Sequence, residues 1–459
     1  MSKGREGQFP QERLYPLEPL FGRFLTPLEQ FFRRATTGGI VLIGVTLVTL
    51  LLSNSALQAS YQHFWHQHLS LQLGQWRLDH DLQEWVNDAL MAVFFFVIGL
   101  ELKRELLVGE LARISDAILP IVAALGGMLV PALLFTALNA GTVGAPGWGI
   151  PMATDIAFAI GILVLLAWRV PRNLLIFLTA LAIADDLGAV LVIAIFYTAH
   201  IAWWALASAG GIFALLLLLN QSGIRQPLPY LLLGILLWYF LLVSGIHASI
   251  AGILVAMTLP ARGSISPARL RVTLRERETD LARLLEQDAP LDPLVHPELS
   301  HLAEELRRTS RAMLSPQQRL EHTVGPWVTF VILPIFALAN AGVDFSQVST
   351  AMLWSSVTLG VVFGLVLGKF VGISLASWLA VRLGLAQLPR GVAWRHLLGA
   401  AWLAGIGFTM SLFISQLAFT QSELREEAKV GILLASLLAG IIGLLWLWLA
   451  SGEKTHATC

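Results

Sequence analysis

Long apolar runs separated by short polar segments dominate the chain. A helix needs about 20 apolar residues to cross a bilayer, and twelve windows of roughly that length can be drawn. They fall at 39–57, 84–106, 117–139, 150–168, 173–198, 201–220, 227–244, 246–261, 324–342, 352–381, 396–418 and 428–450. The pattern predicts an all-α polytopic membrane protein with twelve transmembrane helices.

Two of the connections are long enough to have structure of their own. Residues 262–320 are rich in Arg and Glu and carry leucines at helical spacing, which predicts a helical loop. The segment "LSLQLGQWRL" alternates apolar and polar residues, which predicts a small β-hairpin at about 69–78. A lone hairpin is marginal in water, so we expect this one to pair with a second copy.

The basic residues predict how the chain lies in the membrane. Of the 30 Lys and Arg residues, Arg77, Arg425 and Lys429 fall on one side, Lys369 falls within a window, and all the others fall on the opposite side. Because cytosolic loops carry the excess of Lys and Arg, we expect both termini to be cytosolic. The expected regions are a cytosolic arm at 1–34, spans one to eight at 35–261, a cytosolic helical loop at 262–320, spans nine to twelve at 321–450 and a cytosolic tail at 451–459.

Composition narrows the class of protein further. Hydrophobic residues make up 56% of the chain and charged residues 13%, with a mean hydropathy of +0.71, which is too apolar for an ordinary soluble domain. The net charge of +0 gives no field that would attract nucleic acid. The single cysteine, Cys459, excludes a disulfide framework within the chain. We expect no cofactor and no enzymatic activity.

A few charged residues remain inside the apolar windows, where each costs about 2.5–3.5 kcal/mol unless it faces a bundle interior or water. Those deepest in their windows are Asp155, Asp185, Asp186 and Lys369. Others have a structural alternative: Glu101, Arg104 and Glu105 could form a solvated ion-pair cluster, Asp88 could be interfacial, and His247 could be a hydrogen-bonded packing residue.

Helix-breaking residues fall beside these charges. "GWGIPMATD" places two glycines and a proline just before Thr154 and Asp155, and "AGIGFTMS" places two glycines just before Thr409. Glycine in a membrane helix also permits close packing, so it is a weak signal alone. Its repetition in spans four and eleven predicts interrupted helices, whose dipole ends can stabilise an ion at mid-membrane.

The adjacent aspartates in "LAIADDLGAV" indicate the chemistry. Two carboxylates ~5–6 Å apart at an effective dielectric near ~20 repel by about 3 kcal/mol, which favours retention of one proton by the pair. A small cation that enters between them relieves the repulsion, so cation and proton compete for one site. Such competition is the basis of an antiporter. Hard carboxylate and hydroxyl oxygens favour Na⁺ or Li⁺ as the cation.

Several segments, in order, resemble those of bacterial NhaA-type Na⁺/H⁺ antiporters over about 35–261 and 318–450. They are "NDALMAVFFFVIGLELKREL", "MATDIAFAIGIL", "ALAIADDLGAVLVIAIFYT", "SGIHASIAG", "LEHTVGPWV", "LPIFALANAG", "GKFVGISL" and "GIGFTMSLFI". The resemblance implies inverted repeats with two interrupted, crossing helices. It also implies a bacterial inner-membrane location and a homodimer joined through the outer hairpin.

The resemblance further implies roles for particular residues. Asp185 and Asp186 would bind Na⁺ or Li⁺ and carry protons, with Thr154 as a nearby oxygen ligand. Asp155 and Lys369 would compensate the dipole ends at the helix crossing, and Lys369 would pair with Asp185 when no cation is bound. The implied pH-response cluster is Glu101, Arg104, Glu105, Glu321 and His322. Exchange would be electrogenic, with more protons than cations moved in each cycle.

The sequence departs from the family pattern at two places. Family members often carry a second histidine a few residues after "LEH", where this chain has "GPW", and the 262–320 loop is longer than in the best-known members.

A passive cation channel is the nearer rival function. Channels are typically lined by rings of carboxylates from several symmetric subunits, whereas interrupted helices in one chain suit alternating access better. An intramembrane aspartyl protease would need a Gly-x-Gly-Asp pattern, which neither "ATDIA" nor "ADDLG" provides.

Overall fold

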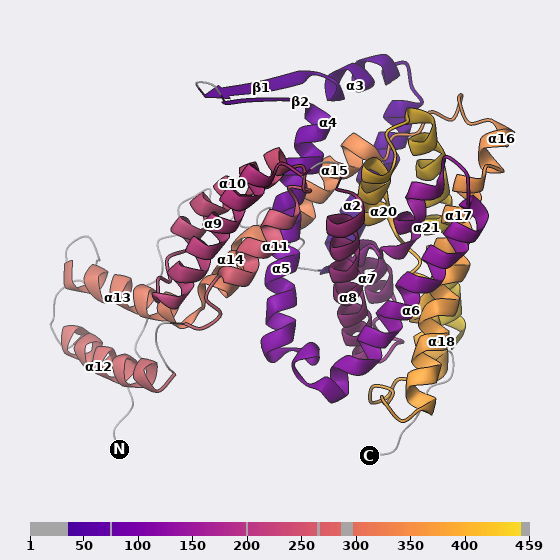
Figure 1. Ribbon diagram of the computed structural model, residues 1–459. Coiled ribbons are helices and arrows are strands. Elements are labelled where there is room, and N and C mark those ends of the chain that lie inside the picture. The colour runs from indigo at the N-terminus through magenta and orange to yellow at the C-terminus, as the bar shows by residue number, and fades with distance from the viewer. Residues whose placement is uncertain (1–34, 74–75, 199–200, 264–266, 286–296, 451–459) are drawn as a thin grey trace, which may run out of the picture.

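The computed structural model describes residues 35–73, 76–198, 201–263, 267–285 and 297–450, which form a mostly helical bundle with one small sheet (Figure 1). The predicted arm at 1–34 and tail at 451–459 lie outside the described residues. Among the described residues, nine helices are long and apolar enough to cross a membrane. They are Leu82–Val108, Ile114–Asn139, Ala145–Leu165, Arg172–Phe196, Trp203–Gln221, Pro227–Ser244, Pro316–Asn340, Ser356–Arg382 and Ser422–Ala450.

Some of these helices are continuous and others change their helical type along the way. The continuous ones are α6 (Ile114–Asn139), α8 (Arg172–Phe196), α9 (Trp203–Gln221), α10 (Pro227–Ser244) and α21 (Ser422–Ala450). Four of the described helices are composite. The first consists of α4 (Leu82–Trp85), η1 (Val86–Leu90) and α5 (Met91–Val108), and the second of η3 (Ala145–Met152) and α7 (Ile156–Leu165). The third consists of α14 (Pro316–Trp327), η4 (Val328–Ile332) and α15 (Leu333–Asn340), and the fourth of α17 (Ser356–Phe363), η5 (Gly364–Gly368) and α18 (Lys369–Arg382). Short helices η2 (Glu110–Ala112) and α16 (Thr350–Leu353) lie in connections.

Two bent pairs of helices raise the number of spans among the described residues to at most 11. Residues of α2 (Ala35–Ser53) meet α3 (Gln58–Trp65) at 113°, and α19 (Trp394–Leu403) meets α20 (Phe408–Ala418) at 45°. The window at 246–261 contains only the nine-residue α11 (Ile250–Thr258), since Gly245 ends α10 in a left-handed conformation with φ 83°. The count of twelve therefore stays a prediction.

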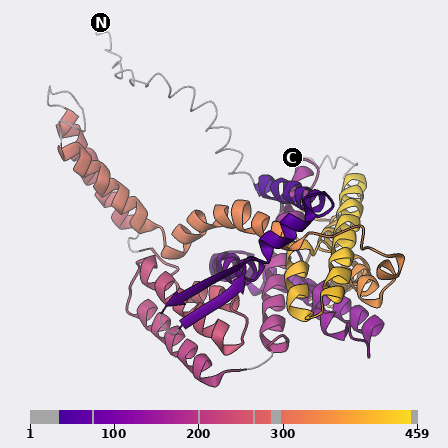
Figure 2. The same ribbon diagram turned by 90° about the horizontal axis from the view of Figure 1, so that it is seen from above.

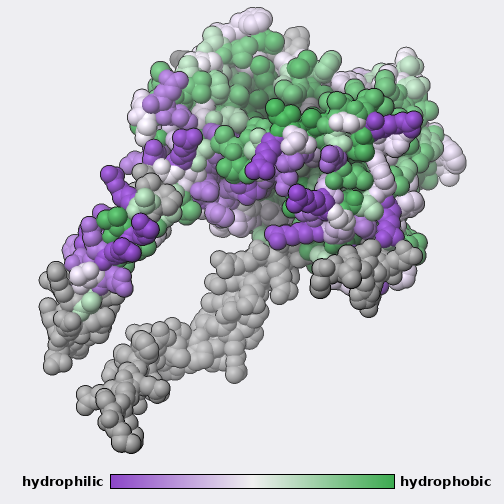
Figure 3. Space-filling view, turned by 90° about the horizontal axis from the view of Figure 1, so that it is seen from below, coloured by the Kyte–Doolittle hydropathy of each residue, from purple (hydrophilic) through white to green (hydrophobic). Residues whose placement is uncertain are grey.

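The outer surface of the bundle is apolar, as its core is. Leu133 on α6 is 67% exposed and Leu437 on α21 is 61% exposed, and many other large apolar residues are similar. The space-filling view from below shows hydrophobic side chains at the rim, with hydrophilic ones gathered beneath the bundle and on a projecting arm (Figure 3). An exposed apolar surface of this extent requires lipid around it, so the chain is a multi-pass membrane protein.

The strands lie on one face of the bundle, which we call the hairpin face (Figure 1). Strands β1 (His68–Leu73) and β2 (Trp76–Asp81) pair antiparallel, with His68 opposite Asp81 and Leu73 opposite Trp76. Asp81 then caps α4, because its side chain accepts a hydrogen bond from Glu84 N at 2.7 Å. Seen from above, the strands lie over the helices α9 to α11 (Figure 2).

A pair of polar helices projects sideways (Figure 2) and lies away from the hairpin face, toward the opposite one (Figure 1). They are α12 (Pro267–Leu285) and α13 (Pro297–Met313), within the region predicted as a helical loop. Arg277 on α12 joins them through an ion pair to Glu305 on α13 at 3.0 Å, and it also pairs with Asp280 on its own helix at 2.9 Å. On α13, hydrogen bonds from Arg307 and Arg308 lower the pKa of Glu304 to about 2.

Close backbone contact fixes α18 against α6. A Cβ atom added at Gly126 would meet the Gly372 carbonyl oxygen, and one added at Gly372 would meet that of Gly126. Small residues at a crossing let two membrane helices pack at the shortest distance. Lys369 follows the π-helical turn η5 and begins α18. The contact between α18 and α6 therefore holds Lys369 at the centre of the bundle.

Candidate ion-binding site

The fourth span is interrupted at the level of Thr154. The 3₁₀-helical η3 ends at Met152, residues 153–155 are extended, and α7 begins at Ile156. Asp155 is the N-cap of α7, and its Oδ1 accepts a hydrogen bond from Phe158 N at 3.1 Å. The chain therefore exposes a helix N-terminus and extended backbone where residues 153–155 cross the bundle.

A second interruption, between α19 and α20, crosses the first. Asp155 N donates to the Ile406 carbonyl oxygen at 2.6 Å, and the Thr154 hydroxyl lies 2.8 Å from the Ala404 carbonyl oxygen. Glycines make this packing possible: a Cβ at Gly407 would lie 3.1 Å from the Ala153 carbonyl oxygen in the first interruption, and one at Gly405 would lie 2.5 Å from the Leu365 carbonyl oxygen in η5. Both breaks predicted from the glycines are thus present, and they cross each other.

We expect Gly405→Ala to lower the melting temperature, because its methyl group would collide with backbone that cannot move aside. Overpacking of this kind costs about 1–3 kcal/mol. The matched control is Gly325→Ala on α14, where no atom of the described residues lies within 4 Å of an added Cβ. Thermal unfolding in detergent measures both. Equal melting temperatures for the two variants would show that the contact between this interruption and η5 tolerates a side chain.

Asp155 serves both half-helices at this crossing. Besides capping α7, its Oδ2 accepts hydrogen bonds from Thr409 N at 3.0 Å and from the Thr409 hydroxyl at 2.6 Å, at the start of α20. Helix N-termini carry partial positive charge, so one buried carboxylate stabilises two of them. Thr409 was missed as a site residue. The available signal was its place two residues after Gly407 in "GIGFT", which marks the first turn of the second half-helix.

Asp185, Thr154 and Lys369 form a fully buried cluster beside the crossing. Lys369 forms an ion pair with Asp185 and donates to the Thr154 hydroxyl at 3.0 Å. That hydroxyl also lies 2.7 Å from Asp185 Oδ2. Desolvating two charges is compensated only by close pairing, which this contact provides. The arrangement brings together three of the residues selected from the sequence.

Asp186 has different surroundings from its neighbour. Successive residues on a helix point about 100° apart, and Asp186 faces a cavity of about 380 Å³ that Asp185 does not line. Asp155 and Thr409 also line this cavity, which extends to Glu101 and Glu321. Asp185 Oδ1 and Asp186 Oδ1 are buried and accept no hydrogen bond in the part of the chain that the structure describes. Each aspartate therefore has an oxygen free to bind a cation or a proton.

The predicted pH-response residues meet where the cavity approaches the face opposite the hairpin. Arg104 on α5 pairs with Glu321 on α14 at 2.8 Å and lies 3.4 Å from Glu105. Glu101 and His322 line the cavity itself. Glu105 lies outside the cavity lining and accepts a hydrogen bond from Glu110 N at 3.1 Å. The cluster is thus one charged group shared by two helices.

Comparison with known proteins places this geometry in a family. The sequence profile of the family described as "Na+/H+ antiporter 1" matches residues 29–447. A Na(+)/H(+) antiporter NhaA of Acidithiobacillus ferrooxidans is 62% identical over 430 residues, covering 94% of this chain and 99% of that protein. Another NhaA, of Syntrophobacter fumaroxidans, is 54% identical, covering 97% of each chain. The interrupted, crossing helices with buried carboxylates are those of an ion carrier. The chain belongs to the NhaA family of Na⁺/H⁺ antiporters, as the resemblance indicated.

Proposed function

We propose that this chain exports Na⁺ in exchange for protons by alternating access. The observation that carries the proposal is the difference between its two aspartates. Asp186 lines a cavity, while Asp185 pairs with Lys369, and each has one buried oxygen that makes no hydrogen bond to any described residue. Buried acceptors of this kind are costly unless something binds them during the cycle.

The cycle follows from these contacts. A cation that enters the cavity meets Asp186 first and then draws the Asp185 carboxylate away from Lys369. The ammonium loses its counter-ion in a buried site, which favours release of its proton. The aspartate oxygens can bind either protons or a cation, but not both at once. If Lys369 and an aspartate each release a proton for one cation, the exchange is electrogenic.

The cation ligands would be hard oxygens of this chain. Candidates are Asp185, Asp186 and Thr154, with the Ala404 carbonyl oxygen beside the threonine. These are hard oxygen donors, which suit a hard monovalent cargo such as Na⁺ or Li⁺, and water oxygens could complete the coordination. We propose no cofactor and no enzymatic activity.

Proton movement in everted membrane vesicles tests the proposal. We expect dequenching of a ΔpH-sensitive dye on addition of Na⁺ or Li⁺, with little response to K⁺, across a pH series. Absence of a Na⁺ response at every pH would overturn the proposal. The protease alternative fits poorly, because Asp155 is fully occupied in capping two helices. A passive channel is the remaining rival, and turnover too fast for a carrier in planar-bilayer recordings would favour it.

The charged cluster supports a regulatory role in this proposal. Arg104, Glu105 and Glu321 are coupled by ion pairs, and Glu101 and His322 line the cation's route. Protonation of this group changes the charge that an entering cation meets. We propose that the cluster adjusts activity to cytosolic pH. We further propose that the cluster and both termini lie in the cytosol and the protein in the bacterial inner membrane, which the distribution of basic residues supports.

We also propose a homodimer formed through the outer hairpin. Strands β1 and β2 have only each other as partners among the described residues, so both edges of the sheet can accept a further strand. Pairing with the hairpin of a second copy would extend the sheet. The ion site lies within one chain, so exchange does not depend on this contact.

Deletion of residues 70–78 should therefore give monomers in detergent that still exchange Na⁺ for protons. Light scattering coupled to a sizing column measures the mass, and vesicle dequenching measures transport. Replacement of residues 74–75 by Asn-Gly, a common turn pair that keeps both strands, is the matched control and should remain dimeric. A deletion variant with the mass of a dimer would rule out the hairpin as the interface.

A further inference from the structure

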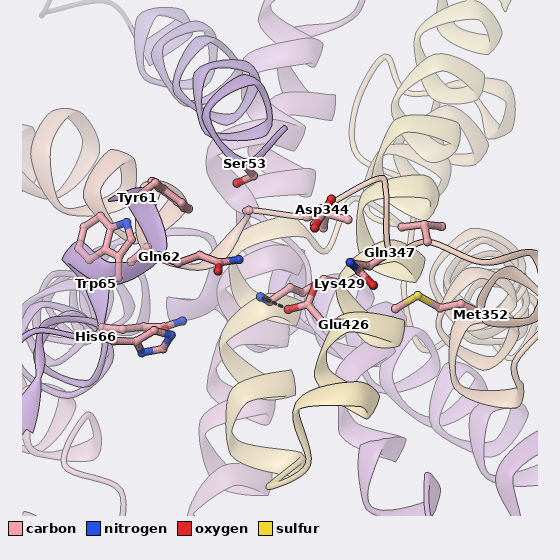
Figure 4. Close-up of a pocket in the computed structure, with 15 residues that line it drawn as sticks. Ser53, Tyr61, Gln62, Trp65, His66, Asp344, Gln347, Met352, Glu426 and Lys429 are labelled. Carbon is pink, nitrogen blue, oxygen red and sulfur yellow. Dashed lines mark hydrogen bonds and ion pairs between the residues drawn. The ribbon is translucent and has the colours of Figure 1, made fainter. Parts of the chain in front are cut away.

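A second cavity lies on the hairpin face, apart from the ion site. It has a volume of about 320 Å³ and lies between α2 and α3, the loop that follows α15, and the start of α21 (Figure 4). None of Thr154, Asp155, Asp185, Asp186 and Lys369 lines it. Its volume is far larger than a bare alkali cation needs and falls within the range of small-ligand pockets, about 300–1,000 Å³.

Aromatic and carboxylate groups share the walls of this cavity. Tyr61 and Trp65 lie on one side with ring centroids 6.5 Å apart, and Glu426 and Lys429 lie on α21, joined at 2.7 Å (Figure 4). Asp344 projects from the loop. An aromatic wall facing acidic groups is the arrangement that recognises organic cations, through cation–π contact and ion pairing.

Two buried polar groups with incomplete hydrogen bonding point to an occupant. Ser53 is 4% exposed and lines the cavity, and its Oγ lies near the Tyr61 hydroxyl but forms no well-aligned hydrogen bond among the described residues. It projects from the end of α2 toward the cavity (Figure 4). Trp65 Nε1 is likewise buried near the Tyr61 hydroxyl, and it too forms no well-aligned hydrogen bond within the described part of the chain. Polar groups of this kind need water or a ligand.

The electrostatics of the cavity favour a cation. Hydrogen bonds from Ser346 and Gln58 hold the pKa of Asp344 below its usual value, so this carboxylate is charged. Lys429 neutralises Glu426, which leaves one negative charge in excess. The helices α2 and α15 both end beside the cavity, and helix C-termini carry partial negative charge.

We propose that this cavity binds a small organic cation of the protonated-amine or amidinium class. Its charged head lies toward Asp344 and Glu426, and its apolar body lies against Tyr61 and Trp65. Because the cavity and the ion site share none of these residues, the inference does not depend on the proposed exchange. A protein that failed to transport Na⁺ could still bind the ligand.

Three probes of the same shape test the charge preference. Benzamidine is cationic, benzamide is neutral and benzoate is anionic, and each is titrated into the purified full chain by calorimetry at constant pH. We expect saturable binding of benzamidine, with benzamide and benzoate weaker by about tenfold or more. Equal binding of benzamide would overturn the proposal, and tighter binding of benzoate would show that Lys429 recognises an anion instead.

Variants locate the binding. Glu426→Gln removes the excess negative charge and should weaken benzamidine binding about tenfold. Glu423→Gln, on an exposed turn of the same helix outside the cavity, is the matched control and should leave it unchanged. If the unpaired Lys429 unfolds the first variant, Met352→Trp fills the cavity without a change of charge and should abolish binding. Undiminished benzamidine binding by a folded Met352→Trp or Glu426→Gln protein would overturn the assignment.

Discussion

Asp186→Asn should abolish Na⁺-dependent proton movement while the protein still reaches the membrane in normal amount. Asparagine keeps the size of the side chain but cannot bind a proton or repel its neighbour. Cation entry then releases no proton, so dequenching of a ΔpH dye in everted vesicles should fall to the background of vesicles that lack the protein. Asp185→Asn should have the same effect, because the two carboxylates act as one titrating unit.

The matched control for this experiment is Asp116→Asn. Asp116 is an exposed carboxylate in the first turn of α6 and lies outside the cavity that reaches Asp186. Its loss should leave transport near that of the unmodified chain. Normal Na⁺-induced dequenching by Asp186→Asn would show that a single carboxylate suffices and would remove the basis for competition between cation and proton.

Lys369→Ala should lower the thermal stability strongly, because it leaves the buried Asp185 carboxylate without its counter-ion. Removing one partner of a buried pair typically costs about 3–5 kcal/mol, and both side chains here are fully buried. The double variant Lys369→Gln with Asp185→Asn leaves no unpaired charge and should recover much of the loss. Melting curves of the two single variants and the double form a complete cycle.

Additive losses in that cycle would show that the two residues do not interact energetically. A second measurement concerns the charge moved in each exchange. If Lys369 carries a proton, Lys369→Ala should be inactive or less electrogenic in current recordings on supported membranes. Unchanged charge movement per Na⁺ in an active variant would show that the lysine stabilises the site but carries no proton.

Much of the site could be predicted because a charged residue within an apolar window is energetically costly and is retained only where it is paired or functional. Asp155, Asp185 and Lys369 stand out by this argument alone, and the breaker residues locate both interruptions. The different surroundings of Asp185 and Asp186 could not be predicted. Which of two adjacent residues faces a lysine depends on the rotation of α8, and an apolar sequence on all sides does not define that rotation.

The span count shows a second limit. The window at 246–261 is apolar enough for a span, yet the helix within it has nine residues. Hydropathy indicates which residues can lie within the membrane, but it does not indicate whether their backbone is helical throughout. The same holds for the π-helical turns η1, η4 and η5, which leave no signature in apolar periodicity.

The double role of Asp155 limits how this protein can move. One carboxylate satisfies backbone or side-chain donors of both α7 and α20. Pulling the crossing apart would strand these groups in a dry interior, at about 1–3 kcal/mol for each unpaired neutral group and more for the carboxylate. The two half-helices should therefore travel as one rigid body through every state of the cycle. The hinges that switch access from one side to the other must lie outside the crossing, in the connections that join it to its neighbours.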